Sequence, residues 1–295
     1  MITWVNRNLK RAALSVTSSY LPFGNSLKRT IFAKMNIEFR PPVKKFTLFE
    51  GGKVAACISI DFDVTRPERF EENRHGTRRL IELGEKYGIP MTWAICGMTA
   101  DQDPDTYELI RTSNVGHEIA VHTYSHIAVP EHDEATIRAD IERCINVLRI
   151  PTRPKTFIFP WNKEGRHNLI RELGFVAFRG KSRAIGVPRK EYGMFNISPV
   201  VYMGAGSYRG SKVINKLMEI CVKNRSVFHL WFHPWDLVRP TVEEFSSSTL
   251  EPVLSHMAEL RDSGLLSIMT MGQLAEYCDK LELMRKDESL EILNK

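Results

Sequence analysis

The chain has 295 residues and a net charge of +6, and this charge is unevenly placed. Residues 1–50 contain nine Lys or Arg and two Asp or Glu, giving +7, so the remainder carries −1. A neutral body lacks the basic face of a nucleic-acid-binding domain, which argues against nucleic acid as a partner. No stretch approaches the roughly 18 consecutive apolar residues that a membrane-spanning helix needs.

Residues 1–50 show no clear hydrophobic period and are predicted to form a basic N-terminal extension, with RPPVKK as a linker. Ser and Thr interrupt the apolar part of NLKRAALSVTSSYL, which is unlike a cleaved signal peptide. The extension is either a weakly ordered leader or a basic segment that contacts anionic lipid. Five widely spaced cysteines without a C-x-x-C motif favour a reducing compartment. We therefore expect a cytoplasmic protein, with peripheral attachment to the inner face of the membrane as a further expectation.

Residues 51–295 are predicted to form one α/β domain, because short apolar runs alternate with amphipathic stretches. We expect strands in VAACISIDFD, MTWAICG, HEIAVHT, KTFIFPW, FVAFRG, NISPVVYM, SVFHLWFHP and LLSIMTM, and helices in HGTRRLIELGEKYG, DEATIRADIERCINVL and RHNLIRELG. Asp133 is a suitable N-cap, and Gly88 and Gly174 suit helix C-termini. Repeated β-then-α units predict a parallel sheet, open or closed into a barrel. In both, reactive residues collect where strands end.

Asp61 and Asp63 end the first predicted strand. Side chains alternate along a strand, so these two carboxylates share a face. Such close carboxylates repel, and one becomes neutral unless a cation lies beside them. The pair therefore indicates a cation site, although a capping Asp with a solvent-exposed neighbour is the alternative.

His122 and His126 follow the third strand. At this spacing on a helical turn the imidazoles lie about 5–6 Å apart at Cβ, which one metal ion can bridge. An isolated pair can equally be structural. His233 ends a late strand, and His229, which lies deeper in the same strand, is expected to be a core histidine. These two cannot share one ion, since four residues of strand span about 13 Å.

Asn162 and Arg179 end the fourth and fifth strands. The predicted strand ends thus supply two Asp, two His, an Asn, an Arg and a further His. Two imidazoles and one carboxylate on a metal ion leave positions for water and a substrate oxygen. A second carboxylate can accept the proton of that water, and a separate histidine can protonate a leaving group. The combination predicts a metal-dependent hydrolase.

At these positions the sequence resembles the polysaccharide deacetylase family, carbohydrate esterase family four, over roughly residues 54–275. The family's Asp-Asp pair, H-[ST]-x-x-H, R-x-P and L-x-H motifs look like Asp61/Asp63, His122-Thr123-Tyr124-Ser125-His126, Ile158-Phe159-Pro160 and Trp231-Phe232-His233. The histidine motif is the most specific of the four. Three departures stand out: Phe62 separates the aspartates, Ile158 replaces the arginine, and Trp231 replaces the leucine.

The resemblance implies a distorted (β/α)7 TIM-like barrel that binds one divalent metal ion, zinc first, with cobalt, nickel or manganese as alternatives. It implies removal of an N-acetyl group from a sugar. By motif order, Asp63, His122 and His126 would be metal ligands, Asp61 the base, and His233 the acid that protonates the departing amine. Phe62 leaves the assignment of base and ligand between the two aspartates open.

In the family the missing arginine orients the base, and Arg179 is the candidate to replace it. We expect substrate contacts from Asn162, Arg179, Trp161, Trp235 and Pro160, although either Trp could instead pack in the core. A backbone N–H near Thr123 and Tyr124 would stabilise the oxyanion, and Asp236 would either tune His233 or cap a turn.

Three readings of the function remain open. The first is an N-acetylated sugar substrate, in the form of a cytoplasmic precursor linked to a nucleotide or a lipid. The second is a formamide or cyclic-amide hydrolase on the same barrel. The third is a sugar-binding protein without turnover.

Overall fold

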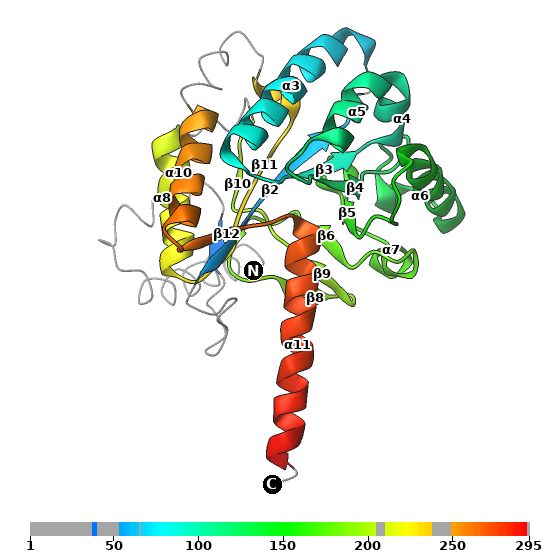
Figure 1. Cartoon of the computed structure of the whole chain (residues 1–295). Coiled ribbons are helices and arrows are strands. Elements are labelled where there is room, and N and C mark those ends of the chain that lie inside the picture. The colour runs from blue at the N-terminus through cyan, green and yellow to red at the C-terminus, as the bar shows by residue number, and fades with distance from the viewer. Residues whose placement is uncertain (1–36, 40–52, 65, 205–209, 238–248, 294–295) are drawn as a thin grey trace, which may run out of the picture.

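The strands form a curled and mostly parallel sheet in the computed structural model, which describes residues 37–39, 53–64, 66–204, 210–237 and 249–293 (Figure 1). The 10-stranded sheet has the order β10-β11-β2-β3-β4-β5-β6-β9-β8, and β12 also pairs with β2. Its strands are β2 (Val54–Phe62), β3 (Thr92–Ile95), β4 (Glu118–Val121), β5 (Thr156–Ile158), β6 (Ala177–Arg179), β8 (Arg189–Glu191), β9 (Met194–Asn196), β10 (Val201–Tyr202), β11 (Phe228–Phe232) and β12 (Leu266–Ile268). A short pair, β1 (Glu38–Phe39) and β7 (Ala184–Ile185), lies apart from it.

Helices cover the outer face of this sheet, as Figure 1 shows for α8 and α10 on one side and α6 and α7 on the other. The helices are α3 (Phe70–Tyr87), α4 (Gly97–Gln102), α5 (Pro104–Thr112), α6 (Glu134–Leu148), α7 (His167–Glu172), α8 (Ser211–Lys223), α10 (Glu251–Asp262) and α11 (Met271–Leu293). Short 3-10 turns are η2 (Pro67–Arg69), η3 (Val129–Glu131), η4 (Pro160–Asn162) and η5 (Pro234–Leu237). The predicted α/β class and barrel-like architecture are confirmed.

Strand β2 is the centre of the sheet, and all nine of its residues are buried. Ile58, Ile60 and Phe62 belong to the larger hydrophobic cluster, whereas Ala55 and Cys57 belong to a smaller cluster with Ala94, Ala120, Ile158 and Ala177. Because side chains alternate, the face of Ala55 and Cys57 is also the face of Ser59 and Asp61. Small residues on this inner face leave space for polar side chains at the carboxyl end of the strand.

Three helix ends lie where the sequence predicted them. The Asp133 side chain accepts a hydrogen bond from the Thr136 N–H at 2.9 Å, which satisfies a free donor at the start of α6. Gly88 after α3 and Gly174 after α7 have φ values of 62° and 93°, which glycine adopts without the Cβ clash of other residues. These three predicted helix ends are confirmed.

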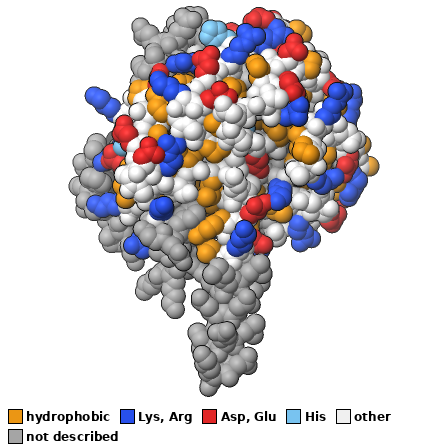
Figure 2. Space-filling view, in the orientation of Figure 1, with side chains coloured by type: hydrophobic (Ala, Val, Ile, Leu, Met, Phe, Trp, Pro, Cys, Tyr) orange, Lys and Arg blue, Asp and Glu red, His pale blue; other side chains and the backbone are white. Residues whose placement is uncertain are grey.

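Basic and acidic side chains are interspersed over the face shown in Figure 2. Among the described residues, no helix has the length and apolar character needed to cross a membrane. The predicted N-terminal extension, the linker and any membrane contact that they make fall on residues 1–36 and 40–52, outside the described residues.

Candidate metal and catalytic site

A cavity of about 500 Å³ opens at the carboxyl ends of β2 and β11, within the size range of small-molecule sites. The residues that line it are Asp61, Asp63, Val64, Arg66, Arg69, His126, Trp161, Asn162, Trp231, His233 and Trp235. Seven of the predicted site residues thus line one cavity: Asp61, Asp63, His126, Trp161, Asn162, His233 and Trp235. The edge of the sheet is the one expected for a parallel α/β protein.

Asp63, His122 and His126 are close enough to share one ion, since their ligand atoms all lie within 4.8 Å of one another. Oδ2 of Asp63 lies 3.0 Å from Nε2 of His126 and 3.7 Å from Nε2 of His122. Oδ1 of Asp63 and both Nε2 atoms are buried without a hydrogen-bond partner. Buried polar atoms are normally satisfied, so two unsatisfied imidazole nitrogens beside a buried carboxylate fit a metal ligand set.

The tautomer of His122 also suits a ligand. Its Nδ1 lies 2.7 Å from the carbonyl oxygen of Ile158. A carbonyl only accepts, so Nδ1 carries the proton and Nε2 directs a lone pair at Asp63, the arrangement usual for metal-binding histidines. Ile158 stands where the family motif has an arginine. Its backbone carbonyl therefore orients the His122 ring.

The loop from His122 to His126 is held in an unusual conformation. Thr123 and His126 have φ values of 60° and 54°, a region that non-glycine residues rarely adopt. Asp140 on α6 holds the loop by accepting hydrogen bonds from the N–H groups of Tyr124, at 2.6 Å, and Ser125, at 3.2 Å. No sequence signal indicated this role of Asp140, because the contact depends on how α6 packs against the loop.

This contact corrects one prediction. The Tyr124 N–H donates to Asp140 and is therefore not available to an oxyanion. Thr123 is fully buried, and its hydroxyl has no hydrogen-bond partner. The use of the Thr123 N–H as an oxyanion donor stays a prediction.

Arg179 and Asp61 form a buried bidentate ion pair across the inside of the sheet. Nη1 and Nη2 of Arg179 each donate to a carboxylate oxygen of Asp61 at 2.6 Å. Burial would raise the pKa of Asp61, but the charge and hydrogen bonds of Arg179 hold it below its ordinary value. Arg179 is 2% exposed and does not line the cavity. It therefore holds Asp61, as expected of the missing arginine's replacement, and its contact with substrate stays a prediction.

A hydrogen-bond chain continues behind this ion pair. Nη1 of Arg179 donates to the Ser59 hydroxyl at 3.2 Å, and Oγ of Ser59 lies 2.9 Å from Nε2 of His229. Nδ1 of His229 faces the carbonyl oxygen of Ile197 at 3.1 Å. Burial lowers the pKa of His229 to about 3, so it is a neutral core histidine, as predicted.

His233 lies above both carboxylates. Its Nε2 is 3.9 Å from Oδ2 of Asp63 and 4.0 Å from Oδ2 of Asp61. Oδ2 of Asp236 accepts a hydrogen bond from the backbone N–H of His233 at 3.0 Å and lies 3.2 Å from the ring Nδ1. Asp236 therefore both caps the turn and orients the ring. Burial would lower the pKa of His233, but Asp63, Asp236 and Asp61 together raise it.

Helix α3 sets the position of η5, the turn that follows His233. A Cβ atom added at Gly76 would lie 2.0 Å from the carbonyl oxygen of Pro234. Only glycine permits this close approach of helix and turn. Gly76 is therefore a positioning residue that the sequence did not indicate.

Aromatic side chains form the wall and the rim of the cavity. Trp235 stacks on His233, and Trp161 contacts His126, with ring centroids 4.3 and 4.7 Å apart. Trp161 is 66% exposed, so it does not pack in the core. Trp161 and Asn162 both have positive φ values, and such strained backbone is typical of ligand sites.

Asn162 and Pro160 are the two remaining residues that were expected to contact substrate. Oδ1 of Asn162 lies 3.4 Å from Nη2 of Arg179, at the inner edge of the cavity. Pro160 is buried in η4 and does not line the cavity, and its contact with substrate stays a prediction.

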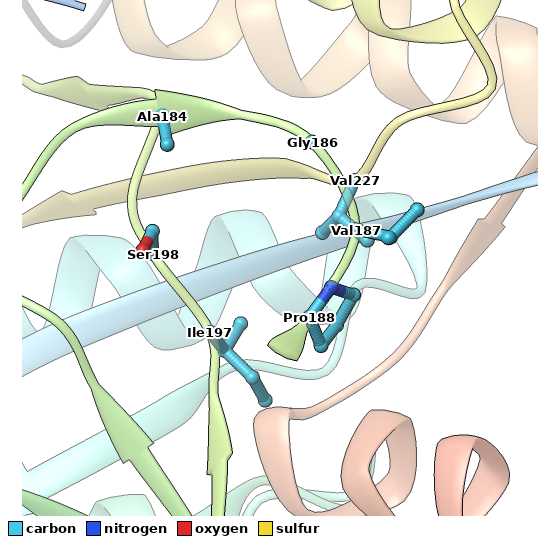
Figure 3. Close-up of a pocket in the computed structure, with 7 residues that line it drawn as sticks. All are labelled: Ala184, Gly186, Val187, Pro188, Ile197, Ser198 and Val227. Atoms are coloured by element: carbon cyan, nitrogen blue, oxygen red, sulfur yellow. The ribbon is translucent and has the colours of Figure 1, made fainter. Parts of the chain in front are cut away.

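A second pocket, of about 10 Å³, lies at the opposite end of β11, beside Val227 and Ile197 (Figure 3). Its volume is about that of one water molecule. It is lined by small and apolar side chains and by Ser198. The larger cavity is therefore the candidate functional site.

Fold and site together define a distorted α/β barrel with a candidate Asp and His metal centre at its carboxyl edge. The family model for polysaccharide deacetylase matches residues 51–173. The resemblance predicted from the sequence is thereby confirmed over residues 51–173, which are similar to this family. The match includes Asp61, Asp63, His122 and His126, whereas Arg179 and His233 lie beyond it.

Several solved structures share the fold at low identity. A protein from Mycobacterium smegmatis named as a polysaccharide deacetylase has 20% identity and a TM-score of 0.63, covering 83% of this chain and 96% of its own. One from Pseudomonas aeruginosa PAO1, also named as a polysaccharide deacetylase, has 14% identity and a TM-score of 0.63, covering 78% and 92%. The Puue allantoinase has 15% identity and the same TM-score, covering 80% and 93%. No curated protein was found to match the chain.

Proposed function

We propose that the protein is a metal-dependent hydrolase that removes the N-acetyl group from a sugar. The observation that carries the proposal is the grouping of ligand atoms from Asp63, His122 and His126 within 4.8 Å of one another, with both histidine Nε2 atoms buried and unsatisfied, beside a second carboxylate and a histidine. The match of residues 51–173 to the polysaccharide deacetylase family model supports the reaction class. Two imidazoles and one carboxylate suit zinc first, with cobalt, nickel and manganese as alternatives.

The residues present fit a divalent ion, which Asp63, His122 and His126 would hold. When bound, such an ion lowers the pKa of a water molecule and polarises the amide carbonyl. Asp61 accepts a proton from that water, since a carboxylate paired with Arg179 retains free lone pairs on both oxygens. The same ion pair fixes the direction of the Asp61 carboxylate.

His233 then protonates the departing amine nitrogen. Asp236 holds the proton on Nδ1 and directs Nε2 into the cavity, and the raised pKa favours the protonated ring. Trp161 and Trp235 offer apolar ring faces to a sugar. The two carboxylates and His233 thus divide the roles of ligand, base and acid.

Metal content and acetate release test this function together. We expect purified protein to hold close to one divalent ion, and Asp63→Ala to lose it along with acetate release from N-acetylated sugars. Asp105→Ala, which removes an exposed carboxylate on α5, is the matched control and should retain both. Full metal occupancy in Asp63→Ala would refute the ligand assignment.

Two alternatives are separated by the same assay. Release of formate in place of acetate would indicate a formamide hydrolase, and ring opening of a cyclic amide would indicate the cyclic-amide hydrolase. A sugar-binding protein without turnover was suggested by the missing arginine and the spaced aspartates. The Arg179–Asp61 ion pair supplies the missing contact, which favours the enzyme.

We also propose a cytoplasmic location, which the five free and buried cysteines support. The basic segment before residue 51 would bring the enzyme to an anionic membrane surface. Removal of residues 1–45 should abolish membrane association while acetate release from a soluble substrate continues. Unchanged association would refute this part of the proposal.

A further inference from the structure

Two arginines of the cavity have no use in the chemistry described above. Arg66 and Arg69 follow Asp63 in the connection between β2 and α3, line the cavity and are exposed. Neither has an acidic partner among the residues that the structure describes. By contrast, Arg74 on the next helix pairs with Asp103, and Arg179 pairs with Asp61.

The acidic groups of the cavity do not balance these two charges. Asp61 is already paired in a bidentate manner with Arg179. Asp63 lies among three histidines, His122, His126 and His233. The outer part of the cavity therefore presents uncompensated positive charge next to the aromatic surfaces of Trp161 and Trp235.

We propose that the substrate carries an anionic group, a phosphate or a carboxylate, which Arg66 and Arg69 bind at the mouth of the cavity. This inference rests on the proposed function and names the substrate class. A guanidinium presents a planar fork of donors that matches both anions in a bidentate manner. The sugar ring would lie against the tryptophans, with its amide at Asp61 and Asp63.

The test compares N-acetylglucosamine, N-acetylglucosamine 1-phosphate and N-acetylmuramic acid as uncharged, phosphorylated and carboxylated probes. For the unmodified protein we expect kcat/KM to be about tenfold higher for the preferred anionic probe, as expected for contacts with exposed cations. R66Q/R69Q should lose this preference through KM, with kcat little changed. Raising the ionic strength should weaken the preference in the unmodified protein only. The two anionic probes distinguish phosphate from carboxylate.

Arg78→Gln is the matched control, because Arg78 is exposed on α3 and does not line the cavity. Equal loss of preference in R78Q would show a general charge effect and overturn the proposal, as would an unmodified protein that does not distinguish charged from uncharged probes. Calorimetry with the deacetylated probes measures binding without turnover. If no acetate is released from any probe, the proposed function fails, while calorimetry still decides whether Arg66 and Arg69 bind an anion.

Discussion

The buried ion pair between Arg179 and Asp61 gives the sharpest test of the site. Arg179→Ile leaves the carboxylate of Asp61, which is 3% exposed, without its partner. Removal of one member of a buried ion pair typically costs about 3–5 kcal/mol. We therefore expect Arg179→Ile to lower the free energy of unfolding by about this amount, and to lower kcat about 100-fold through a misplaced base.

The register of the sheet supplies a rescue. Ile158 on β5 lies directly opposite Arg179 on β6, and Ile158 belongs to the cluster on the inner face. Neighbouring strands are about 4.8 Å apart, so an arginine at position 158 lies within reach of the same carboxylate. We expect Ile158→Arg/Arg179→Ile to recover much of the stability and activity.

Urea denaturation and acetate release measure the two effects separately. Asp61→Asn/Arg179→Ile removes both charges and should recover stability without activity. Arg179→Lys retains the charge without the bidentate geometry, and should lose more activity than stability. Wild-type stability in Arg179→Ile, or failure of both double variants to regain stability, would refute the argument.

Three further variants test residues that position the site. Asp140→Ala removes the acceptor for two loop N–H groups and should weaken metal affinity by about 10-fold or more, measured by competition with a chelator, whereas Asp140→Asn should retain part of it. Gly76→Ala should displace Pro234 and lower kcat at unchanged metal content, and equal kcat would show that η5 can move freely. His117 tests linkage to pH. Burial lowers the pKa of His117 from 6.5 to about 4. Between pH 6.5 and about 4 the imidazole is therefore protonated in the unfolded chain but neutral in the folded protein. Stability should fall there by up to about 3 kcal/mol, and His117→Asn should remove this contribution from unfolding curves measured across the window.

Periodicity and strand ends predicted most of the fold and much of the site. The apolar runs gave strands at the expected places, and β2 and β4 delivered Asp61, Asp63 and His122 to one edge. The position along the strand also separated His229 from His233 correctly, since the deeper residue is buried in the core and the one at the strand end lines the cavity.

Contacts between distant segments could not be predicted in the same way. Nothing in the sequence near Asp140 indicates that its carboxylate holds the Tyr124 N–H, because that contact depends on how α6 packs against the loop. The oxyanion prediction at Tyr124 was wrong for this reason. Gly76 is a similar case, since its role depends on the distance between α3 and η5.

The spaced aspartates and the displaced arginine are two parts of one arrangement. Asp61 lies within β2 and Asp63 just after it, so both carboxylates face the inside of the sheet at different depths. The deeper carboxylate needs a counter-charge from within the sheet, and Arg179 provides it from β6. The shallower one remains free for His122, His126 and an ion. Phe62 between them is fully buried on the opposite face, so the intervening residue stabilises the core and does not interrupt the site. The divergence from the family motifs therefore changes which strands supply the groups, while the proposed ligand, base and acid still lie at one cavity.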